Sequence, residues 1–191
     1  MPAILAAQQP PICNRTIIME ITVKQATSED VPVLSTIAQL TFPLAGPLNS
    51  SKKEIAKYIT ENLNESVFQK LVESDEVFVA CAQSGNELVG FIVMKYRSSH
   101  PNNADLENSA ELQRLYVLPK YHGTKSSKLL VSEALKECSE KGIDAFWLSV
   151  YSGNSRAKKF YSKFGFQEIG TTHFKMGNEK HLDIIMVANI A

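Results

Sequence analysis

The chain has few cysteines and no grouping of them. Cys13, Cys81 and Cys138 lie far apart, form no Cys-x-x-Cys pair and leave one thiol over if any two join. This usage fits a reducing, intracellular setting and not a disulfide framework. We therefore expect a cytoplasmic protein, with the nucleus as the alternative, and no metal site.

An excess charge of either sign is also missing. Lysine and arginine number 20, and aspartate and glutamate number 20 as well. Nucleic acids and anionic membranes attract proteins through a surplus of positive charge, so neither partner is expected. No run of apolar residues approaches the length that a membrane-spanning helix needs.

The first 19 residues lack the marks of a targeting segment. Their short apolar stretch, residues 3–7, has no basic residue before it, and Arg15 is their only arginine. A signal peptide or a transit peptide would differ on both counts. We expect residues 1–19 to be a disordered extension. A chain of 191 residues, 44% of them hydrophobic, has room for one core, so residues 20–191 are expected to form one domain.

Hydrophobic periodicity from Glu20 onward predicts a mixed order of strands and helices. The expected strands cover residues 21–26, 77–81, 88–94, 111–118, 145–150 and 183–187, with a short one near 169–170. The expected helices run from 31 to a stop at Thr41-Phe42-Pro43, from a cap at Asn49-Ser50-Ser51, over 67–72, from beyond Gly123 to Lys141-Gly142, and over 154–164. Such an order is typical of an α/β protein with helices packed around one central sheet.

Residues 115–131 read as a strand, a tight loop and the start of a helix. The first turn of a helix has unpaired backbone N–H groups and a partial positive charge, so it can hold a diphosphate. Glycine-poor connections of this kind are also common without any ligand. From the residues alone, an ordinary strand-to-helix connection is therefore favoured over a phosphate site.

Residues 149–166 predict a capped amphipathic helix. Asn154 is a good N-cap, and Gly165 permits a left-handed turn at the end. Phe160 and Phe164 are best explained as core residues. Tyr161 differs from them because a buried hydroxyl needs a hydrogen-bond partner, so for this residue a functional role competes with a structural one.

Taken together, these two segments resemble the GNAT superfamily of acetyltransferases, and the resemblance extends from Glu20 to the C-terminus. Residues 154–166, Asn-Ser-Arg-Ala-Lys-Lys-Phe-Tyr-Ser-Lys-Phe-Gly-Phe, resemble the family segment Asn-x-x-Ala-x-x-Phe-Tyr-x-x-x-Gly-Phe. Residues 115–123 are similar to the strand that leads into the family's coenzyme loop. That loop usually reads Arg/Gln-x-x-Gly-x-Gly/Ala, whereas residues 122–127 read His-Gly-Thr-Lys-Ser-Ser. Both signature glycines are missing. Residues 170–186 resemble the ending of members related to spermidine/spermine acetyltransferases.

The resemblance implies a three-layer α/β sandwich in which helices flank a central, mostly antiparallel, splayed sheet. It also implies transfer of an acetyl group from acetyl-CoA to a primary amine of a polyamine, an amino acid or a peptide. An interaction module that binds acyl-CoA with little or no catalysis is the alternative, and the missing glycines favour it. A homodimer stays open. The residues that the resemblance assigns to coenzyme binding are Leu115, Tyr116, Val117, His122, Gly123, Thr124, Lys125, Ser126, Ser127, Asn154, Ala157 and Phe160.

The resemblance also implies catalytic roles. Tyr161 corresponds to the tyrosine that protonates the departing thiolate. The backbone N–H near Val117 corresponds to the donor that polarises the thioester carbonyl. Glu111 resembles in position a glutamate that takes the amine proton through water, although a solvated strand-end charge explains it equally well. His122 and His173 are lesser candidates for that base. Residues 40–64 and the loop after Met94 are expected to shape the acceptor pocket.

Overall fold

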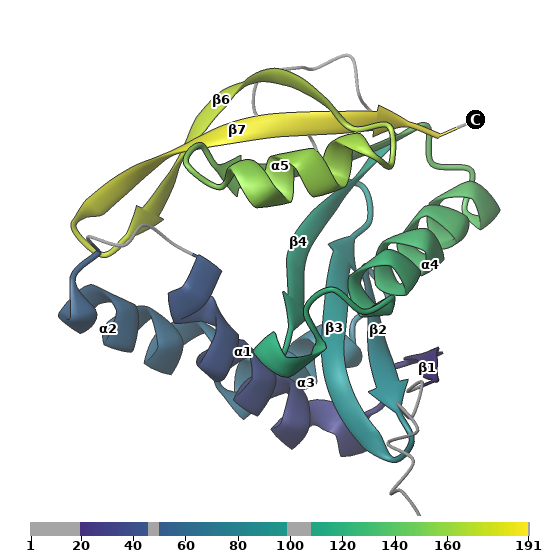
Figure 1. The fold of residues 1–191 in the computed structure, drawn as a ribbon, viewed down its shortest axis with the longest axis horizontal. Coiled ribbons are helices and arrows are strands. Elements are labelled where there is room, and N and C mark those ends of the chain that lie inside the picture. Colours follow the sequence, from purple (N-terminus) through teal and green to yellow (C-terminus); the bar gives the residue numbers. More distant parts are fainter. Residues whose placement is uncertain (1–19, 46–49, 99–107, 191) are drawn as a thin grey trace, which may run out of the picture.

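The computed structural model describes residues 20–45, 50–98 and 108–190, which form one sheet of seven strands with helices on both of its faces (Figure 1). The strands are β1 Ile21–Gln25, β2 Val77–Ser84, β3 Glu87–Lys95, β4 Ser109–Val117, β5 Ala145–Tyr151, β6 Gln167–Met176 and β7 Glu179–Asn189. The helices are α1 Val31–Ala45, α2 Lys52–Asn62, α3 Glu65–Val72, α4 Ser126–Glu140 and α5 Ser155–Ser162, with short 3-10 turns at Ser28–Asp30 and Pro119–Tyr121. No helix within this part of the chain is long and apolar enough to cross a membrane.

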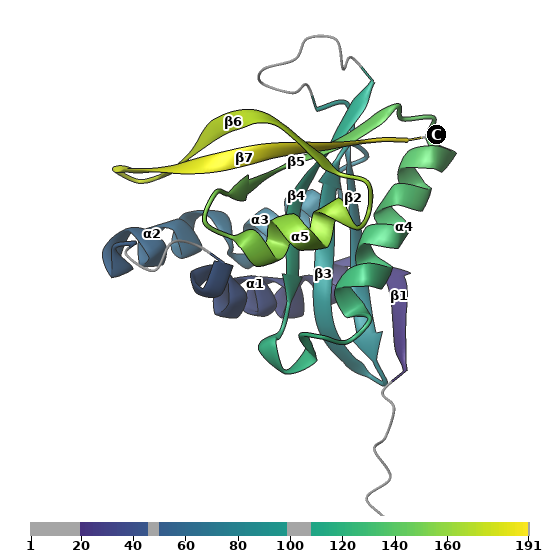
Figure 2. The same ribbon diagram turned by 45° about the horizontal axis from the view of Figure 1, so that its top comes forward.

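The strand order is β1-β2-β3-β4-β5-β7-β6, and every neighbouring pair is antiparallel except β4 and β5. The parallel pair is joined over a short stretch, Ser109 to Glu111 of β4 against Ala145 to Trp147 of β5. Beyond that point the two strands diverge (Figure 2). The mostly antiparallel, splayed sheet expected from the resemblance is therefore confirmed.

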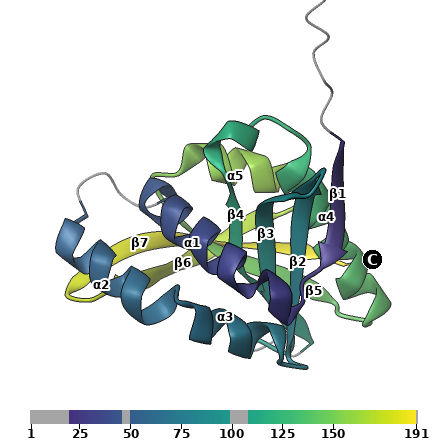
Figure 3. The ribbon, with the colours of Figure 1, turned by 90° about the horizontal axis from the view of Figure 1, so that it is seen from below.

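Each face of the sheet has its own apolar core. On one face, α4 and α5 pack on a cluster that includes Leu130, Phe146 and Phe166. On the other face, α1 and α3 cover a cluster that includes Leu34 and Phe68 (Figure 3). The three-layer arrangement is thereby confirmed, because burial of both faces of the sheet requires helices on both sides.

The predicted end of the first helix is wrong. Thr41-Phe42-Pro43 was expected to stop it, but α1 continues to Ala45 with Pro43 inside. Proline removes the hydrogen bond of its own nitrogen and crowds the carbonyl one turn earlier, which can bend a helix without ending it. The remaining predicted strands and helices within the described residues are present. The expected disordered extension at 1–19, the cap residue Asn49 and most of the polar loop after Met94 lie outside the described residues.

Gly90 of β3 lets the end of β4 approach closely. A Cβ atom on Gly90 would lie 2.6 Å from the carbonyl oxygen of Tyr116 and 2.7 Å from Cγ2 of Val117. These are backbone and short-chain atoms in a paired strand, so they cannot move aside without shifting β4. We expect Gly90→Ala to lower the free energy of unfolding by about 1–3 kcal/mol, measured by urea denaturation. An unchanged unfolding midpoint would show that β4 is less constrained than its packing indicates.

Candidate active site

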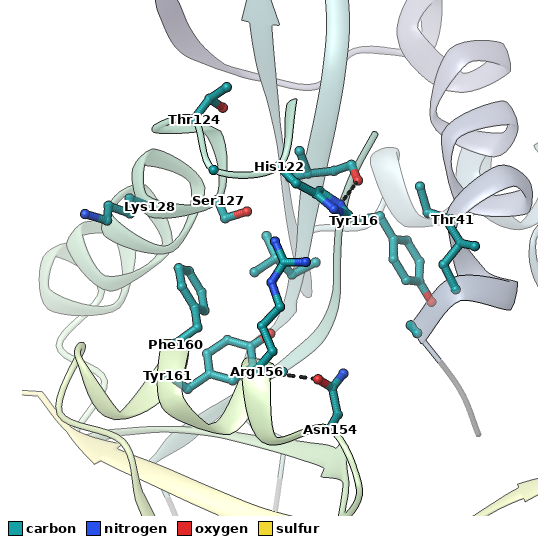
Figure 4. Close-up of a pocket in the computed structure, with 16 residues that line it drawn as sticks. Thr41, Tyr116, His122, Thr124, Ser127, Lys128, Asn154, Arg156, Phe160 and Tyr161 are labelled. Carbon is teal, nitrogen blue, oxygen red and sulfur yellow. Dashed lines mark hydrogen bonds between the residues drawn. The ribbon is translucent and has the colours of Figure 1, made fainter. Parts of the chain in front are cut away.

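A first cavity of about 390 Å³ lies between the end of β4, the start of α4 and the first turns of α5 (Figure 4). It is lined by Thr41, Leu44, Ala45, Leu115, Tyr116, Val117, His122, Gly123, Thr124, Ser127, Lys128, Asn154, Arg156, Ala157, Phe160 and Tyr161. Every residue assigned to coenzyme binding from the sequence is in this set except Lys125 and Ser126. Lys125 is exposed, and the hydroxyl of buried Ser126 lies 2.7 Å from that of Thr124.

Lys128 and Arg156 are two cavity cations that the sequence reasoning missed. They lie in the first turns of α4 and α5. Basic residues at the predicted starts of these two helices could have identified them from the sequence. A neighbouring groove of about 680 Å³ shares Lys128, Arg156 and Phe160 with the first cavity and adds Lys159 and Lys163. Among the described residues that line this groove there is no carboxylate. The groove is therefore suited to an anion.

The backbone of the loop before α4 does not require glycine at the two positions where the family has one. Of the residues between His122 and Ser127, only Gly123 has a left-handed backbone, with φ of 83°. Lys125 has φ of −78° and ψ of −6°, a conformation open to any residue. Side chains at the two positions where the family has glycine therefore impose no backbone strain. Lys125 makes no side-chain cap, and the Thr124 hydroxyl accepts from the N–H of Ser126 at 3.2 Å, so the next N–H groups of α4 can serve an anion.

At the end of β4, some backbone groups point toward the place where β4 and β5 separate. The N–H of Leu118 donates to the carbonyl of Val89 in β3 over 2.9 Å. Backbone groups alternate in direction along a strand, so the N–H and C=O of Val117 point to the opposite edge, where β5 has moved away. The Nε2 of His122 lies 2.9 Å from the oxygen of Val117, which must accept the bond, so His122 carries a proton on Nε2.

Tyr161 lines the first cavity from α5. The side chain of Asn154 caps this helix, with Oδ1 accepting from the N–H of Ala157 over 3.0 Å (Figure 4). Tyr161 is 8% exposed and packs edge-to-face on Phe160. Burial, with a smaller contribution from Tyr116, raises the pKa of Tyr161 above its ordinary value. The phenol is therefore a neutral O–H donor at physiological pH.

A second cavity of about 270 Å³ adjoins the first, and the two share Ala45, Leu115, Tyr116, Asn154, Ala157 and Tyr161. Its other walls come from α1, α2, β4, β5, β6 and β7. Several walls are aromatic: Phe42 stacks on Tyr58 with ring centroids 4.5 Å apart, and Phe174 meets Tyr58 edge-on at 5.4 Å. Residues 40–64, expected to shape the acceptor pocket, contribute Phe42, Ile55 and Tyr58 to it.

Three side chains with acid or base chemistry line the second cavity besides its tyrosines: Arg114, His181 and Asp183. Asp183 is 7% exposed, and burial raises the pKa of its carboxyl, while the Ser149 hydroxyl and the nearby His181 and His173 oppose the rise. The sequence reasoning missed Asp183. The sequence feature that could have identified it is a charged residue two positions before Ile185, which places both on the inward face of a buried strand.

Glu111 lies outside the lining of both cavities. Its carboxylate accepts hydrogen bonds from the hydroxyl of Ser98 at 2.8 Å and from Nε2 of Gln113 at 3.2 Å. Gln113 lines the second cavity, so Glu111 is one hydrogen bond removed from it. His173 is exposed on β6 and also lies outside the two linings. A role of either residue as the base stays a prediction.

The chain matches the family model of the acetyltransferase (GNAT) family over residues 44–166. It is 31% identical to an uncharacterized N-acetyltransferase of Mycobacterium tuberculosis over 84% of this chain and 98% of that protein. It is 30% identical to the spermidine N(1)-acetyltransferase of Thermoplasma acidophilum, over 78% of this chain and 89% of that protein. Among solved structures, the PaiA N-acetyltransferase of T. acidophilum in complex with coenzyme A aligns with a TM-score of 0.75 and 27% identity, covering 90% of this chain and 99% of that one.

The family match covers the end of β4, the loop, α4 and α5, which supply most of the lining of the first cavity. The resemblance read from residues 115–123 and 154–166 is thus confirmed by comparison over most of the chain. This chain belongs to the GNAT family of acetyltransferases, and it is an N-acetyltransferase.

Proposed function

We propose that the protein transfers an acetyl group from acetyl-CoA to the primary amine of a small molecule or a peptide by direct attack. The observation that carries this proposal is the meeting of the two cavities at Tyr116 and Tyr161, beside the divergence of β4 and β5. A transferase that acts by direct attack needs its two substrates to reach one point from different sides. The first cavity is suited to the coenzyme and the second to the acceptor.

The residues of the first cavity fit coenzyme A. The N–H groups of the first turn of α4 after Ser126, with the Ser127 hydroxyl and the Lys128 ammonium, would hold the diphosphate. The basic groove that shares Arg156 would take a further phosphate. The relative from T. acidophilum that was solved with coenzyme A supports this assignment. Lys125 is not among the lining residues, so we expect it neither to contact the diphosphate nor to obstruct it.

The proposed reaction forms a C–N bond and breaks a C–S bond, and acetyl-CoA supplies the thioester. The N–H of Val117, directed toward the diverging strands, donates to the thioester carbonyl as charge develops on its oxygen. An alkyl ammonium must first lose a proton, which Glu111 accepts through water in this proposal. Tyr161 then protonates the departing sulfur, and its phenolate takes up, directly or through water, the second proton that the nitrogen loses as the amide forms.

The alternative function, an interaction module with little or no catalysis, was favoured by the two missing glycines. The unstrained backbone at Lys125 weakens that argument. The test is an acetylation assay with acetyl-CoA and a panel of primary amines, in which the product is identified by mass spectrometry. Acetylated amine supports the proposal. Tight coenzyme binding without any acetylated product would favour the module instead.

Release of coenzyme A is often followed with a thiol reagent, and two cysteines of this protein should not interfere. Cys81 and Cys138 are buried, and burial raises the pKa of each thiol to about 12. A raised pKa leaves almost no thiolate at pH 8, and the thiolate is the reactive form. In a Cys13→Ser variant we expect no rapid labelling of the native protein and labelling of both thiols after denaturation. Rapid labelling of the native protein would contradict the burial of these side chains.

Some finer expectations belong to this proposal. We propose residues 20–191 as the catalytic domain, a cytoplasmic location and no nucleic-acid or membrane partner, on the grounds of composition and charge. A homodimer stays open.

A further inference from the structure

We infer that Asp183 binds a second, non-reacting ammonium group of the acceptor, so that the protein prefers alkyl diamines and polyamines over monoamines of the same length. This inference rests on the proposed function. Asp183 is the one carboxylate among the described residues that line the second cavity, and it lies on β7. Tyr161, where the reaction is proposed, lines the same cavity from α5 and is shared with the first cavity, whereas Asp183 is not.

The carboxylate of Asp183 has no full cationic partner among the residues that the structure describes. No lysine or arginine forms an ion pair with it, and its neighbours are the Ser149 hydroxyl and the imidazoles of His181 and His173. His181 is paired with a different carboxylate, Glu179, at 3.1 Å. A buried carboxylate without a cation is costly, and a bound ammonium would remove much of that cost. Burial raises the pKa of Asp183, in keeping with incomplete compensation.

The walls of the second cavity suit an alkyl chain that carries a cation. Phe42 and Tyr58 form a stacked pair, and Phe174 meets Tyr58 edge-on. Tyr151 and His181 meet edge-on beside Asp183. Aromatic rings pack against methylene groups, and their faces attract ammonium groups. An apolar chain with a charged end would therefore be bound along its length as well as at its end.

Arg114 makes the electrostatic environment of the second cavity differ from one part to another. It lies on β4, two residues before Tyr116, and contacts the Phe68 ring. Burial raises the pKa values of Tyr58 and Tyr116, and the positive charge of Arg114 opposes both rises. A positive charge near Tyr116 disfavours an ammonium and favours a neutral amine at that end of the cavity. The negative charge of Asp183 has the opposite preference. A diamine is therefore oriented with its neutral, reactive nitrogen toward Tyr161 and its ammonium toward Asp183.

The test compares two acceptors that differ by one ammonium, butane-1,4-diamine and butan-1-amine, in the wild-type protein and in Asp183→Asn. Asparagine keeps the shape of the side chain and loses its charge. We expect the wild type to favour the diamine, and the variant to lose roughly 10-fold or more of that preference, mainly through KM for the diamine. Values of kcat/KM for the monoamine should change little. Asp144→Asn is the matched control, because Asp144 is exposed at the other end of β5 and lies outside both cavity linings.

Several outcomes would overturn the inference and leave the proposed function intact. One is a wild type that acetylates both amines with equal kcat/KM. Another is an Asp183→Asn variant that keeps the diamine preference, or one that loses kcat equally for both amines, which would place Asp183 at the reacting nitrogen. If the wild type acetylates no amine, the proposed function fails and the inference fails with it. Should Asp183→Asn not fold, Asp183→Glu keeps the charge and lengthens the side chain, so it should keep the diamine preference and shift it toward a diamine with fewer methylene groups; an unshifted preference would contradict the contact.

Discussion

Replacing Tyr161 by phenylalanine should lower kcat by about 100-fold and leave KM for both substrates nearly unchanged. The ring of Tyr161 packs against Phe160 and Phe166, and phenylalanine keeps those contacts. Only the hydroxyl is lost, at the point where the two cavities meet. Steady-state kinetics with a good acceptor, under conditions where chemistry limits the rate, measure the effect.

The raised pKa of Tyr161 does not conflict with a role as an acid. Burial destabilises the phenolate, so the pKa of Tyr161 rises. A thiolate that leaves within the same cavity is also poorly solvated, so its own pKa rises for the same reason. Proton transfer depends on the difference between the two pKa values, and this difference changes less than either value alone.

Two comparisons make the Tyr161 result interpretable. Tyr96→Phe removes a phenolic hydroxyl that bonds to Glu137 and lies outside both cavities, so its kcat should stay close to that of the wild type. Tyr116 lines both cavities, and Tyr116→Phe tests whether the other shared phenol is the acid. A Tyr161→Phe variant with wild-type turnover would show that Tyr161 has only a structural role.

A negative charge at Ser127 should abolish most coenzyme binding without harming the fold. Ser127 lies in the first turn of α4 and lines the first cavity. In Ser127→Glu, the carboxylate would lie close to the proposed diphosphate, and repulsion between like charges at such distances raises Kd for coenzyme A by about 100-fold. The same charge is favourable at a helix N-terminus, so the Tm of the ligand-free protein should stay the same or rise slightly.

Calorimetry gives the Kd and thermal unfolding gives the Tm. Ser139→Glu is the control, because Ser139 is exposed in the last turn of α4 and lies outside the first cavity. There the added carboxylate should slightly lower the Tm and leave the affinity for coenzyme A unchanged. If Ser127→Glu binds coenzyme A as tightly as the wild type, the diphosphate does not lie at the start of α4.

Local chemistry was enough to predict α5 and its surroundings. A side chain that caps a helix, an apolar stripe with helical spacing and a glycine for the left-handed turn act over a few residues, so they can be read in order along residues 154–166. The same holds for the strand and helix start at 115–131, and the cavity residues predicted there are local neighbours. The end of α1 was missed because proline often ends a helix but can also lie inside one, and the local sequence does not decide between the two.

The acceptor side of the site depends on contacts between distant segments. Asp183, Ser149, Tyr58 and Arg114 lie on four different elements, and only the strand order and the divergence of β4 from β5 bring them to one cavity. No spacing along the chain encodes that arrangement. Glu111 shows the same limit, since its position in the sequence resembles that of a catalytic base, but only the structure shows that its carboxylate bonds to Ser98 and to Gln113 of the second cavity. The sequence also could not show the backbone conformation at Lys125. A missing glycine matters only where the backbone is left-handed, and in this loop that position is Gly123, which is a glycine.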